Sequence, residues 1–578
     1  MKELRGKPLM AGITSACSMG FLLFGYDQGV MGTIINSSSF VKQFNNPSST
    51  QQGLITGLYD VGCLFGSILA FLAGERLGRK KSIYLGAWIV IVGTILQTTA
   101  HVVVHLIVAR VFTGIGVGIM TAVVPTWQAE VSQAHNRGAM ITIEAVNIII
   151  GFVLSNWVSF GASYVTTNFQ WIFPISMQVV FAIYLLLIGP FLVESPRWLA
   201  HHEDIHKATH VLARLLDTTE DDARVQQSRA EIQEALRLES GGSLREIFTN
   251  GGQQNFRRML LGVGALYFQQ MSGINTVGYY LPVILEDQVG MSNRLAQIVA
   301  GCGAIFYLIA SLPPIWFIDR VGRRPAMIWG AAALTVVNIL LCVGFNIPGT
   351  HGTILVVVMY FLYYAAFALS FLNVSWIYPP EINSLKMRSM GASLASCSNW
   401  LFNGISVTIT PIALASIGWK FYLMWAIFNF SFIPMIYFLY PETKGLHLEQ
   451  IDHIFEEDVG SSSGGELHHH HHKDRKKRPF ACLTQGVRES VKNPPSVGAV
   501  RAGGGGVVAV RDEEMGMAET GAGVGSGLGA SASAARREGA KQEDEKALKA
   551  AAEEASDGRS SNEVPEIENV EDADRASR

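Results

Sequence analysis

The chain has 578 residues, of which 49% are hydrophobic and only 16% are charged, and its formal net charge is −3. This charged fraction is well below the roughly 25% of soluble domains. Apolar stretches of about 20 residues, the length that spans a bilayer's hydrocarbon core, recur along the chain. The composition excludes an ordinary soluble domain, gives no sign of a nucleic-acid partner, and predicts an all-α membrane protein embedded in lipid.

Twelve apolar segments are predicted to cross the membrane, six on each side of a polar block. They are 10–34, 53–73, 83–100, 105–126, 140–161, 169–191, 258–285, 295–318, 326–346, 353–377, 389–415 and 418–440. The first segment lacks the cleavage pattern of a signal peptide and is predicted to be retained. The predicted units are an N-terminal six-helix bundle (1–191), a cytoplasmic helical linker (192–257), a C-terminal six-helix bundle (258–440), a cytoplasmic segment (441–460) and a disordered cytoplasmic tail (461–578).

Basic residues indicate the orientation. The segments between spans 2 and 3 and between spans 8 and 9 are rich in Lys and Arg, whereas the alternate loops contain few of either. Because cytoplasmic loops hold the positive excess, both termini are predicted to face the cytosol. The membrane expected for this protein is the plasma membrane.

The linker and the tail differ in character. Apolar residues recur at helical spacing within 205–215 and 232–236, which predicts short amphipathic helices on the inner membrane face. Beyond residue 460 the sequence is low in complexity and is predicted to be disordered. Five consecutive histidines, 468–472, belong to this tract and are not predicted to bind metal.

The two halves share a repeated pattern. "GERLGRKKS" at 74–82 and "DRVGRRP" at 319–325 have glycines 244 residues apart. A glutamate seven residues before an arginine occurs in each half, and the two glutamates lie 251 residues apart. "VESPRWL" follows span 6 and "PETKG" follows span 12, with glutamates 248 residues apart. Three pairs with similar offsets predict an internal duplication of six spans.

The charged residues of these repeats are predicted to form salt bridges at the cytoplasmic ends of the helices, because a charge near the membrane is costly unless it is paired. We expect these bridges to latch one half to the other when the outer side is open; the alternative is that the basic strings only set topology. The predicted gate residues are Glu75, Arg79, Glu130, Arg137, Glu194, Arg197, Asp319, Arg323, Glu381, Arg388 and Glu442.

Seven strings in order resemble the sugar porter family of the major facilitator superfamily, from about residue 10 to residue 450. They are "GERLGRKKS", "RVFTGIGVG", "EVSQAHNRG", "ESPRWL", "QQMSGIN", "DRVGRRP" and "PETKG". The subgroup that the chain resembles most is the fungal sugar and polyol porters. The resemblance implies two parallel bundles with a substrate site between them near the membrane midplane. It also implies a monomer that moves a small-molecule sugar by alternating access.

The span at 258–285 carries more polar groups than a lipid-facing helix. Amides both donate and accept hydrogen bonds, which suits sugar hydroxyls; the alternative role is hydrogen bonding between helices. The resemblance assigns the Gln and Asn residues to sugar binding and adds an aromatic stacking residue in span 10 and an Asn in span 11. The predicted substrate-binding residues are Gln269, Gln270, Asn275, Tyr279, Trp376 and Asn399.

The chain departs from the family at two expected sugar ligands and in the lead-in to the span 10 tryptophan, which reads "SFLNVSW". The usual glutamine of span 5 falls at Ala145, and the usual asparagine of span 8 falls at Phe306 or Tyr307. These two sugar ligands are either missing or supplied by other side chains. The candidates are Glu144, Asn147 and Asn373. Glucose is therefore not singled out, and other sugars and polyols remain open.

Energy coupling is predicted to rest on Asp27, about midway along span 1. A lone carboxylate at that depth is expensive as an anion and needs a proton or a cation. Arg110, at the start of "RVFTGIGVG", is the expected partner. The resemblance assigns proton uptake to this Asp; the alternative is a static structural ion pair.

These features predict a proton-coupled importer of a monosaccharide, a hexose or a pentose. The alternatives are a polyol symporter for glycerol or inositol, an uncoupled facilitator, and a sugar sensor that signals through its tail. The sequence has no Walker-type phosphate loop, so it is not predicted to be driven by ATP. It has no metal-ligand set and no nucleophile–base cluster, so neither an enzyme nor a bound cofactor is predicted.

Overall fold

The computed structural model describes residues 4–131, 137–202, 205–239, 254–384, 387–446, 451 and 454–455. These residues belong to one compact unit, Met1–Ser496. All regular elements in the described ranges are helices, which confirms the predicted all-α class.

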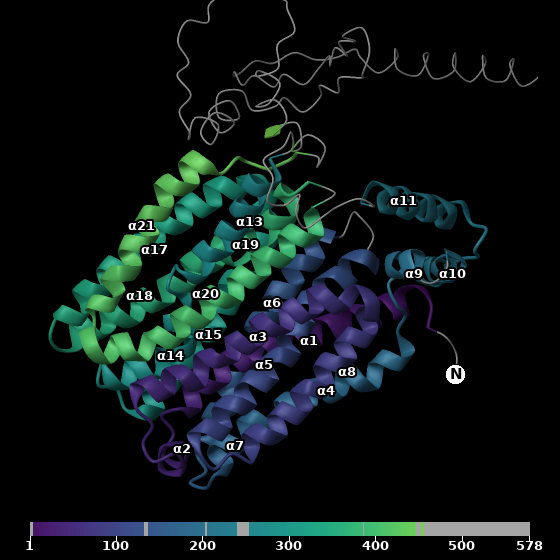
Figure 1. Ribbon diagram of the computed structural model, residues 1–578. Coiled ribbons are helices and arrows are strands. Elements are labelled where there is room, and N and C mark those ends of the chain that lie inside the picture. The colour runs from purple at the N-terminus through teal and green to yellow at the C-terminus, as the bar shows by residue number, and fades with distance from the viewer. Residues whose placement is uncertain are drawn as a thin grey trace, which may run out of the picture. The chain divides into compact units, whose positions relative to one another are not determined.

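The N-terminal half forms the purple to blue helices of Figure 1. Its elements are α1 (Gly6–Ile34), α2 (Ser38–Gln43), α3 (Ser49–Leu77), α4 (Arg79–Thr98), α5 (Val103–Val131), α6 (Arg137–Ala162), α7 (Phe169–Ser176), α8 (Gln178–Ile188) and the 3-10 turn η2 (Gly189–Phe191). Helix α3 begins with a capping box: the Ser48 hydroxyl accepts from the Gln51 backbone N–H, and the Gln51 amide accepts from the Ser48 N–H. This box satisfies two donors at the start of the helix.

In the described part of the chain the N-terminal half is followed by α9 (Pro196–His202), α10 (Ile205–Leu216) and α11 (Ala223–Glu239). Helix α10 packs against α9 and α1. It buries Ala208, Val211, Leu212 and Leu215 on one face, as the helical spacing in the sequence predicts.

The C-terminal half forms the teal to green helices of Figure 1. Its elements are α13 (Asn255–Gln270), α14 (Ile274–Asp287), α15 (Asn293–Ser311), α16 (Pro314–Val321), α17 (Arg323–Asn346), α18 (Thr350–Ala368), α19 (Phe371–Ile382), α20 (Arg388–Ile417) and α21 (Lys420–Leu439).

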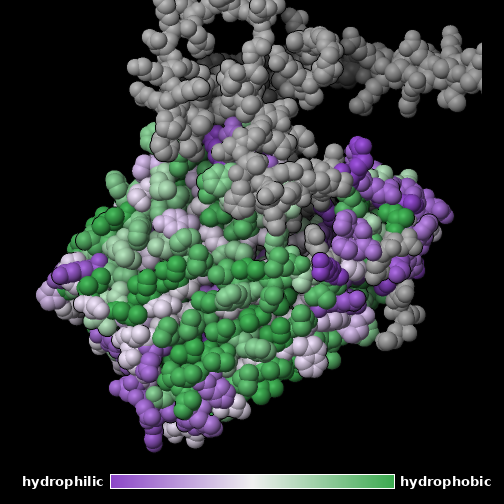
Figure 2. All heavy atoms as spheres, viewed as in Figure 1, coloured by the Kyte–Doolittle hydropathy of each residue, from purple (hydrophilic) through white to green (hydrophobic). Residues whose placement is uncertain are grey.

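Eleven helical segments of the described chain are long and apolar enough to cross a membrane. The predicted span without such a segment, 258–285, consists of α13 and α14, with 16 and 14 residues. The break between them ends at Gly273, whose φ of +100° suits a residue without a Cβ. The helix order agrees with the predicted twelve-span fold. Figure 2 shows apolar side chains over the outer faces of the helices and hydrophilic ones gathered on α9–α11 and on the loops at the far end.

The two halves meet mainly along three pairs of helices: α3 with α20, α6 with α15, and α1 with α14. One close approach involves Gly57 of α3, where a side chain would collide with the Thr408 hydroxyl and with the Gly404 carbonyl. Small residues let helix backbones come together in this way. This contact lies in the first third of α3, whereas Arg79 lies just beyond the opposite end of that helix.

Candidate functional site

A cavity lies between the two halves and is lined by side chains from both of them. The cavity is lined by all six residues predicted to bind substrate: Gln269, Gln270, Asn275, Tyr279, Trp376 and Asn399. The structure therefore brings together side chains from three segments far apart in sequence; their role in binding remains a prediction.

The break between α13 and α14 positions the amides of this wall. The Gln270 amide donates to the Asn399 side-chain oxygen at 2.5 Å, and the Asn275 amide donates to the Gln270 side-chain oxygen at 2.8 Å. The Gln269 amide donates to the carbonyls of Phe371 and Leu372, both at 3.2 Å, where α19 begins. The result is a connected row of amides that ties spans 7, 10 and 11 together and faces the cavity.

The wall from the N-terminal half is different, because four of its five side chains are apolar. Its members are Phe24, Gln28, Ile148, Ile149 and Phe152. Tyr307 and Tyr364 add stacked rings, with centroids 4.9 Å apart, on the side of the C-terminal half. The site thus offers hydrogen bonds on one side and apolar and aromatic surface on the other.

Glu144, Asn147 and Asn373 were the candidates to replace the two missing sugar ligands. None of them is among the described residues that line this cavity. The Asn147 amide donates to the Ser18 hydroxyl at 2.9 Å, and both Glu144 and Asn373 are buried elsewhere. Tyr307, one of the two span 8 positions named from the sequence, does line the cavity. The sequence reasoning missed Tyr364 and the apolar wall, because apolar lining residues look the same in sequence as core residues.

We expect Trp376→Ala to weaken substrate binding about tenfold, which corresponds to about 1.4 kcal/mol. The ring lines the cavity, and an aromatic face stacks on the C–H surface of a bound ring. Equilibrium binding to the purified protein measures the effect. Trp329→Ala is the matched control, because Trp329 is exposed on the outer face of α17. Unchanged affinity in Trp376→Ala would remove this residue from the site.

The predicted pair Asp27–Arg110 forms in the interior of the N-terminal half. Arg110 Nη1 donates to Asp27 Oδ1 at 2.5 Å, and both side chains are fully buried. The Gln178 amide also donates to Asp27 Oδ1, at 3.2 Å. The guanidinium lies over the Tyr59 ring, 4.4 Å from its centroid. The next residue, Gln28, lines the cavity, so α1 connects the ion pair directly to the candidate substrate site.

A second buried carboxylate, Asp60 of α3, lies in the same region and was not identified from the sequence. The charges of Arg110 and Asp27 both act on it. The signal was present, since Asp60 is an acidic residue within the apolar span 53–73, as Asp27 is within span 1.

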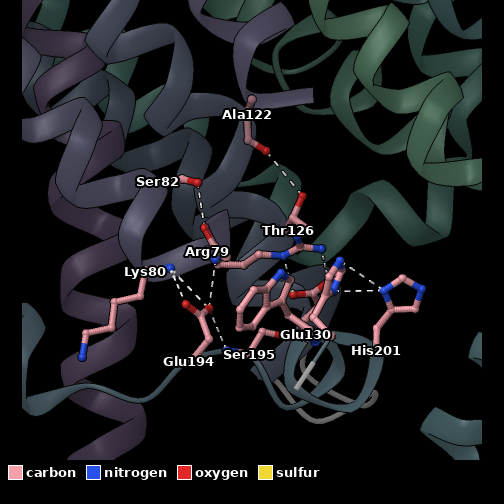
Figure 3. A network of polar contacts seen from close by, with 12 residues as sticks. Arg79, Lys80, Ser82, Ala122, Thr126, Glu130, Glu194, Ser195 and His201 are labelled. Atoms are coloured by element: carbon pink, nitrogen blue, oxygen red, sulfur yellow. Dashed lines mark hydrogen bonds and ion pairs between the residues drawn. The ribbon is translucent and has the colours of Figure 1, made fainter. Parts of the chain in front are cut away.

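The first copy of the repeated string forms an ion network at the junction of α3 and α4 (Figure 3). Arg79 Nε and Nη2 donate to the two carboxylate oxygens of Glu130 at 3.0 and 2.9 Å. The backbone N–H groups of Arg79 and Lys80 donate to Glu194 at 3.0 and 3.1 Å. Glu194 thus occupies the N-terminus of α4, where unpaired N–H groups favour an anion.

The glycine of the string is required by this geometry. Gly78 has a φ of +87°, and a Cβ there would lie 2.8 Å from a Glu194 carboxylate oxygen. Burial raises the pKa of the Glu194 carboxyl above its usual range, and hydrogen bonds from the backbone of Ser195, Lys80 and Arg79 act in the opposite direction.

The second copy repeats the arrangement atom for atom. Arg323 Nε and Nη2 donate to Glu381 at 3.1 and 2.8 Å, and the Arg323 and Arg324 backbone N–H groups donate to Glu442 at 2.9 and 3.1 Å. Gly322 has a φ of +98° and would place a Cβ 2.7 Å from Glu442. Asp319 adds an ion pair to Arg323 at 2.8 Å. The matching networks agree with the duplication predicted from the sequence.

The ion pairs of Arg79 and Arg323 each join residues of the same half, whereas a latch between the two halves was expected from the sequence. The first network joins the α3–α4 junction to the segment after the sixth span, and the second joins the α16–α17 junction to the segment after the twelfth span. In this structure the networks therefore brace the bundles internally, and the latch in an outward-open state remains a prediction. Arg197 lies in α9 and Arg388 begins α20. The side chains of Glu75 and Arg137 are outside the described residues.

Comparisons with known proteins agree with this fold and site. The family model "Sugar (and other) transporter" matches residues 13–455. The MFS-type transporter oryC of Aspergillus oryzae is 39% identical over 467 residues, covering 79% of this chain and 87% of that protein. The sugar transporter STL1 of Saccharomyces cerevisiae is 36% identical over 470 residues, covering 78% and 82%.

Among solved structures, the proton:xylose symporter XylE superposes with a TM-score of 0.66 at 24% identity, covering 78% of this chain and 99% of XylE. At this identity the likeness concerns the fold. The extent of the family match makes the chain a transporter, not an enzyme, as the sequence predicts. The chain belongs to the sugar porter family of the major facilitator superfamily.

Proposed function

We propose that this chain is a proton-coupled symporter that carries a monosaccharide, a hexose or a pentose, into the cell by alternating access. The observation that carries the proposal is the buried Asp27–Arg110 pair, one residue from a cavity lined by four linked amides. A carboxylate buried in a membrane protein is retained for function at a considerable energetic cost.

The mechanism follows from the charges. While Asp27 is ionised, it holds Arg110 and thereby fixes α1 to α5. Protonation of Asp27 removes its charge and loosens this link, which permits α1 to shift with the cavity wall that it carries. Substrate bound to the amides of α13, α14 and α20 lies on the opposite half. The proton thus acts on the N-terminal half and the sugar on the C-terminal half, on opposite sides of the interface between them. Both are needed before the two halves move relative to each other.

The relatives support this proposal. STL1 is described as a sugar transporter, and XylE as a proton:xylose symporter. A High-affinity glucose transporter 1 of Candida albicans is 28% identical over 470 residues. We extend the proposal to the plasma membrane, with both termini in the cytosol and the helices α9–α11 on the inner face.

A polyol is the second candidate substrate. The observation that favours it is the apolar wall of the N-terminal half, where Phe152, Ile148 and Ile149 face the cavity. A wall whose one polar member among the described lining residues is Gln28 leaves most hydroxyl groups on that side of a sugar without partners. A ligand whose hydroxyls all point to the amide wall avoids this loss.

The test is uptake into proteoliposomes that carry an imposed pH gradient, inside alkaline, with a panel of hexoses, pentoses and polyols. We expect at least one of these solutes to accumulate above its outside concentration and the accumulation to collapse when a protonophore is added. Equilibration without accumulation for the whole panel would replace the symporter with a facilitator. Binding without any movement across the membrane would favour a sensor.

A further inference from the structure

Asp60 is a buried acid that the proposed mechanism does not yet use. It lies on α3, its exposure is 0%, and within the described chain neither of its carboxylate oxygens has a hydrogen-bond partner. An unsatisfied buried polar group is unusual and calls for an explanation. An acid in this position is either a charge without a partner or a neutral carboxylic acid.

The nearest cation is already engaged. Arg110 uses Nη1 for Asp27 and Nε for the Ile55 carbonyl at 3.3 Å, while its Nη2 has no hydrogen-bond partner in the described part of the chain. The charges of both Arg110 and Asp27 act on Asp60. One guanidinium therefore bonds to Asp27, acts on Asp60 only through its charge, and has one donor to spare.

The other groups that the described chain places around Asp60 are neutral. They are Cys63 on its own helix, Tyr279 and Tyr280 on α14, and Gly404 on α20. If both carboxylates were ionised, the site would hold a net negative charge in a low-dielectric interior, at a cost of several kcal/mol. Two carboxylates that share one site do not ionise together under such conditions.

We propose that Asp60 is a second proton-binding carboxylate, which shares Arg110 with Asp27. While Asp27 pairs with Arg110, Asp60 holds a proton on one of its carboxylate oxygens. When Asp27 takes up a proton, the guanidinium turns its free Nη2 to Asp60, and Asp60 releases its proton to water in the transport pathway. One proton enters and one leaves, so the site keeps one proton and one ion pair in both arrangements.

This exchange moves the charge to the interface between the halves. Asp27 lies within the N-terminal half, whereas Asp60 packs against α20, where a Cβ on Gly404 would lie 3.1 Å from the Asp60 Cβ. Helix α20 also carries Asn399 of the amide row and the buried Asn403. The ionisation of Asp60 would therefore be felt directly by a helix that holds the substrate.

Infrared difference spectroscopy tests the proposal without transport. The purified wild-type protein should show the C=O stretching band of a protonated carboxylic acid, shifted in D₂O, and Asp60→Asn should lose this band. Asp27→Asn should lose the same band, because Arg110 then pairs with Asp60 and ionises it. This second variant keeps the test valid should Asp60→Asn fail to fold. Glu144→Gln is the matched control, since Glu144 is another buried carboxyl, and it should leave the band that depends on Asp27 in place.

If the wild type has no carboxylic-acid band that is lost in both Asp60→Asn and Asp27→Asn, the proposal is overturned. The protonation state proposed for Asp60 does not depend on the proposed proton coupling, but its effect on transport does. In the proteoliposome assay we expect Asp60→Asn to reduce gradient-driven accumulation about tenfold and to retain substrate exchange. If the wild type accumulates solute and Asp60→Asn does so equally well, the inference fails and the symporter proposal stands. If the wild type does not accumulate any solute, the symporter proposal fails, while the infrared result still decides the state of Asp60.

Discussion

Asp27→Asn is expected to abolish the accumulation of substrate against its gradient and to preserve exchange of substrate across the membrane. Asparagine keeps the size of aspartate and resembles its protonated form, but it binds no proton. The ion pair with Arg110, at 2.5 Å and with both side chains fully buried, is lost. Loss of one partner from a buried pair costs about 3–5 kcal/mol in soluble proteins. Pairing of Arg110 with Asp60 offsets part of this cost, so the variant should unfold at a moderately lower temperature.

Two measurements on the same proteoliposomes separate the outcomes. The first is uptake driven by an imposed pH gradient, and the second is counterflow, in which labelled solute exchanges with unlabelled solute without a gradient. Asp222→Asn is the control, because Asp222 forms an ion pair with Arg224 at 2.9 Å at the start of α11, on the surface of the protein. Accumulation by Asp27→Asn at the wild-type level would clear Asp27 of the coupling role, and loss of counterflow as well would point to a structural role.

The fold was predictable to a large extent, because membrane spans are set by long apolar runs and the backbone must satisfy its own hydrogen bonds in lipid. The breaks within spans were harder to predict. The span at 258–285 separates into α13 and α14 at Gly273. A Cβ on this glycine would lie 2.8 Å from the ring of Trp425, which belongs to α21, much further along the chain. Local sequence shows a glycine there, but it does not show what the glycine must accommodate.

The candidate site was predictable where chemistry is unusual for a membrane interior. Polar residues such as Gln270 and Asn399 stand out in an apolar span, and the structure brings them within 2.5 Å of each other. The apolar wall did not stand out, because Phe152 resembles any core residue until its neighbours are known. The charged residues of both networks stand out in the sequence, but the sequence could not say that Arg79 and Glu130 pair within one half.

The repeated networks lead to the second prediction: Arg323→Gln should slow transport about tenfold or more and should leave the order of preference among solutes unchanged. Arg323 makes two charge-assisted hydrogen bonds to Glu381 and one ion pair to Asp319. Such bonds are each worth about 1.5–3 kcal/mol. They join the α16–α17 junction to α19, so their loss changes the stability of one arrangement of the bundle relative to another. The cavity lies elsewhere, and its lining is untouched.

Initial uptake rates test the expected slowing of transport, and competition among solutes tests the expected order of preference. Arg79→Gln tests the equivalent network, and Arg320→Gln is the control, because Arg320 is an exposed residue of the same string. A double variant with Glu381→Gln sharpens the result. Since both single variants break the Arg323–Glu381 bonds, the double variant should be about as slow as Arg323→Gln alone. Rates that fall additively would show that the two residues act separately, and an altered order of solutes would place Arg323 in the substrate pathway.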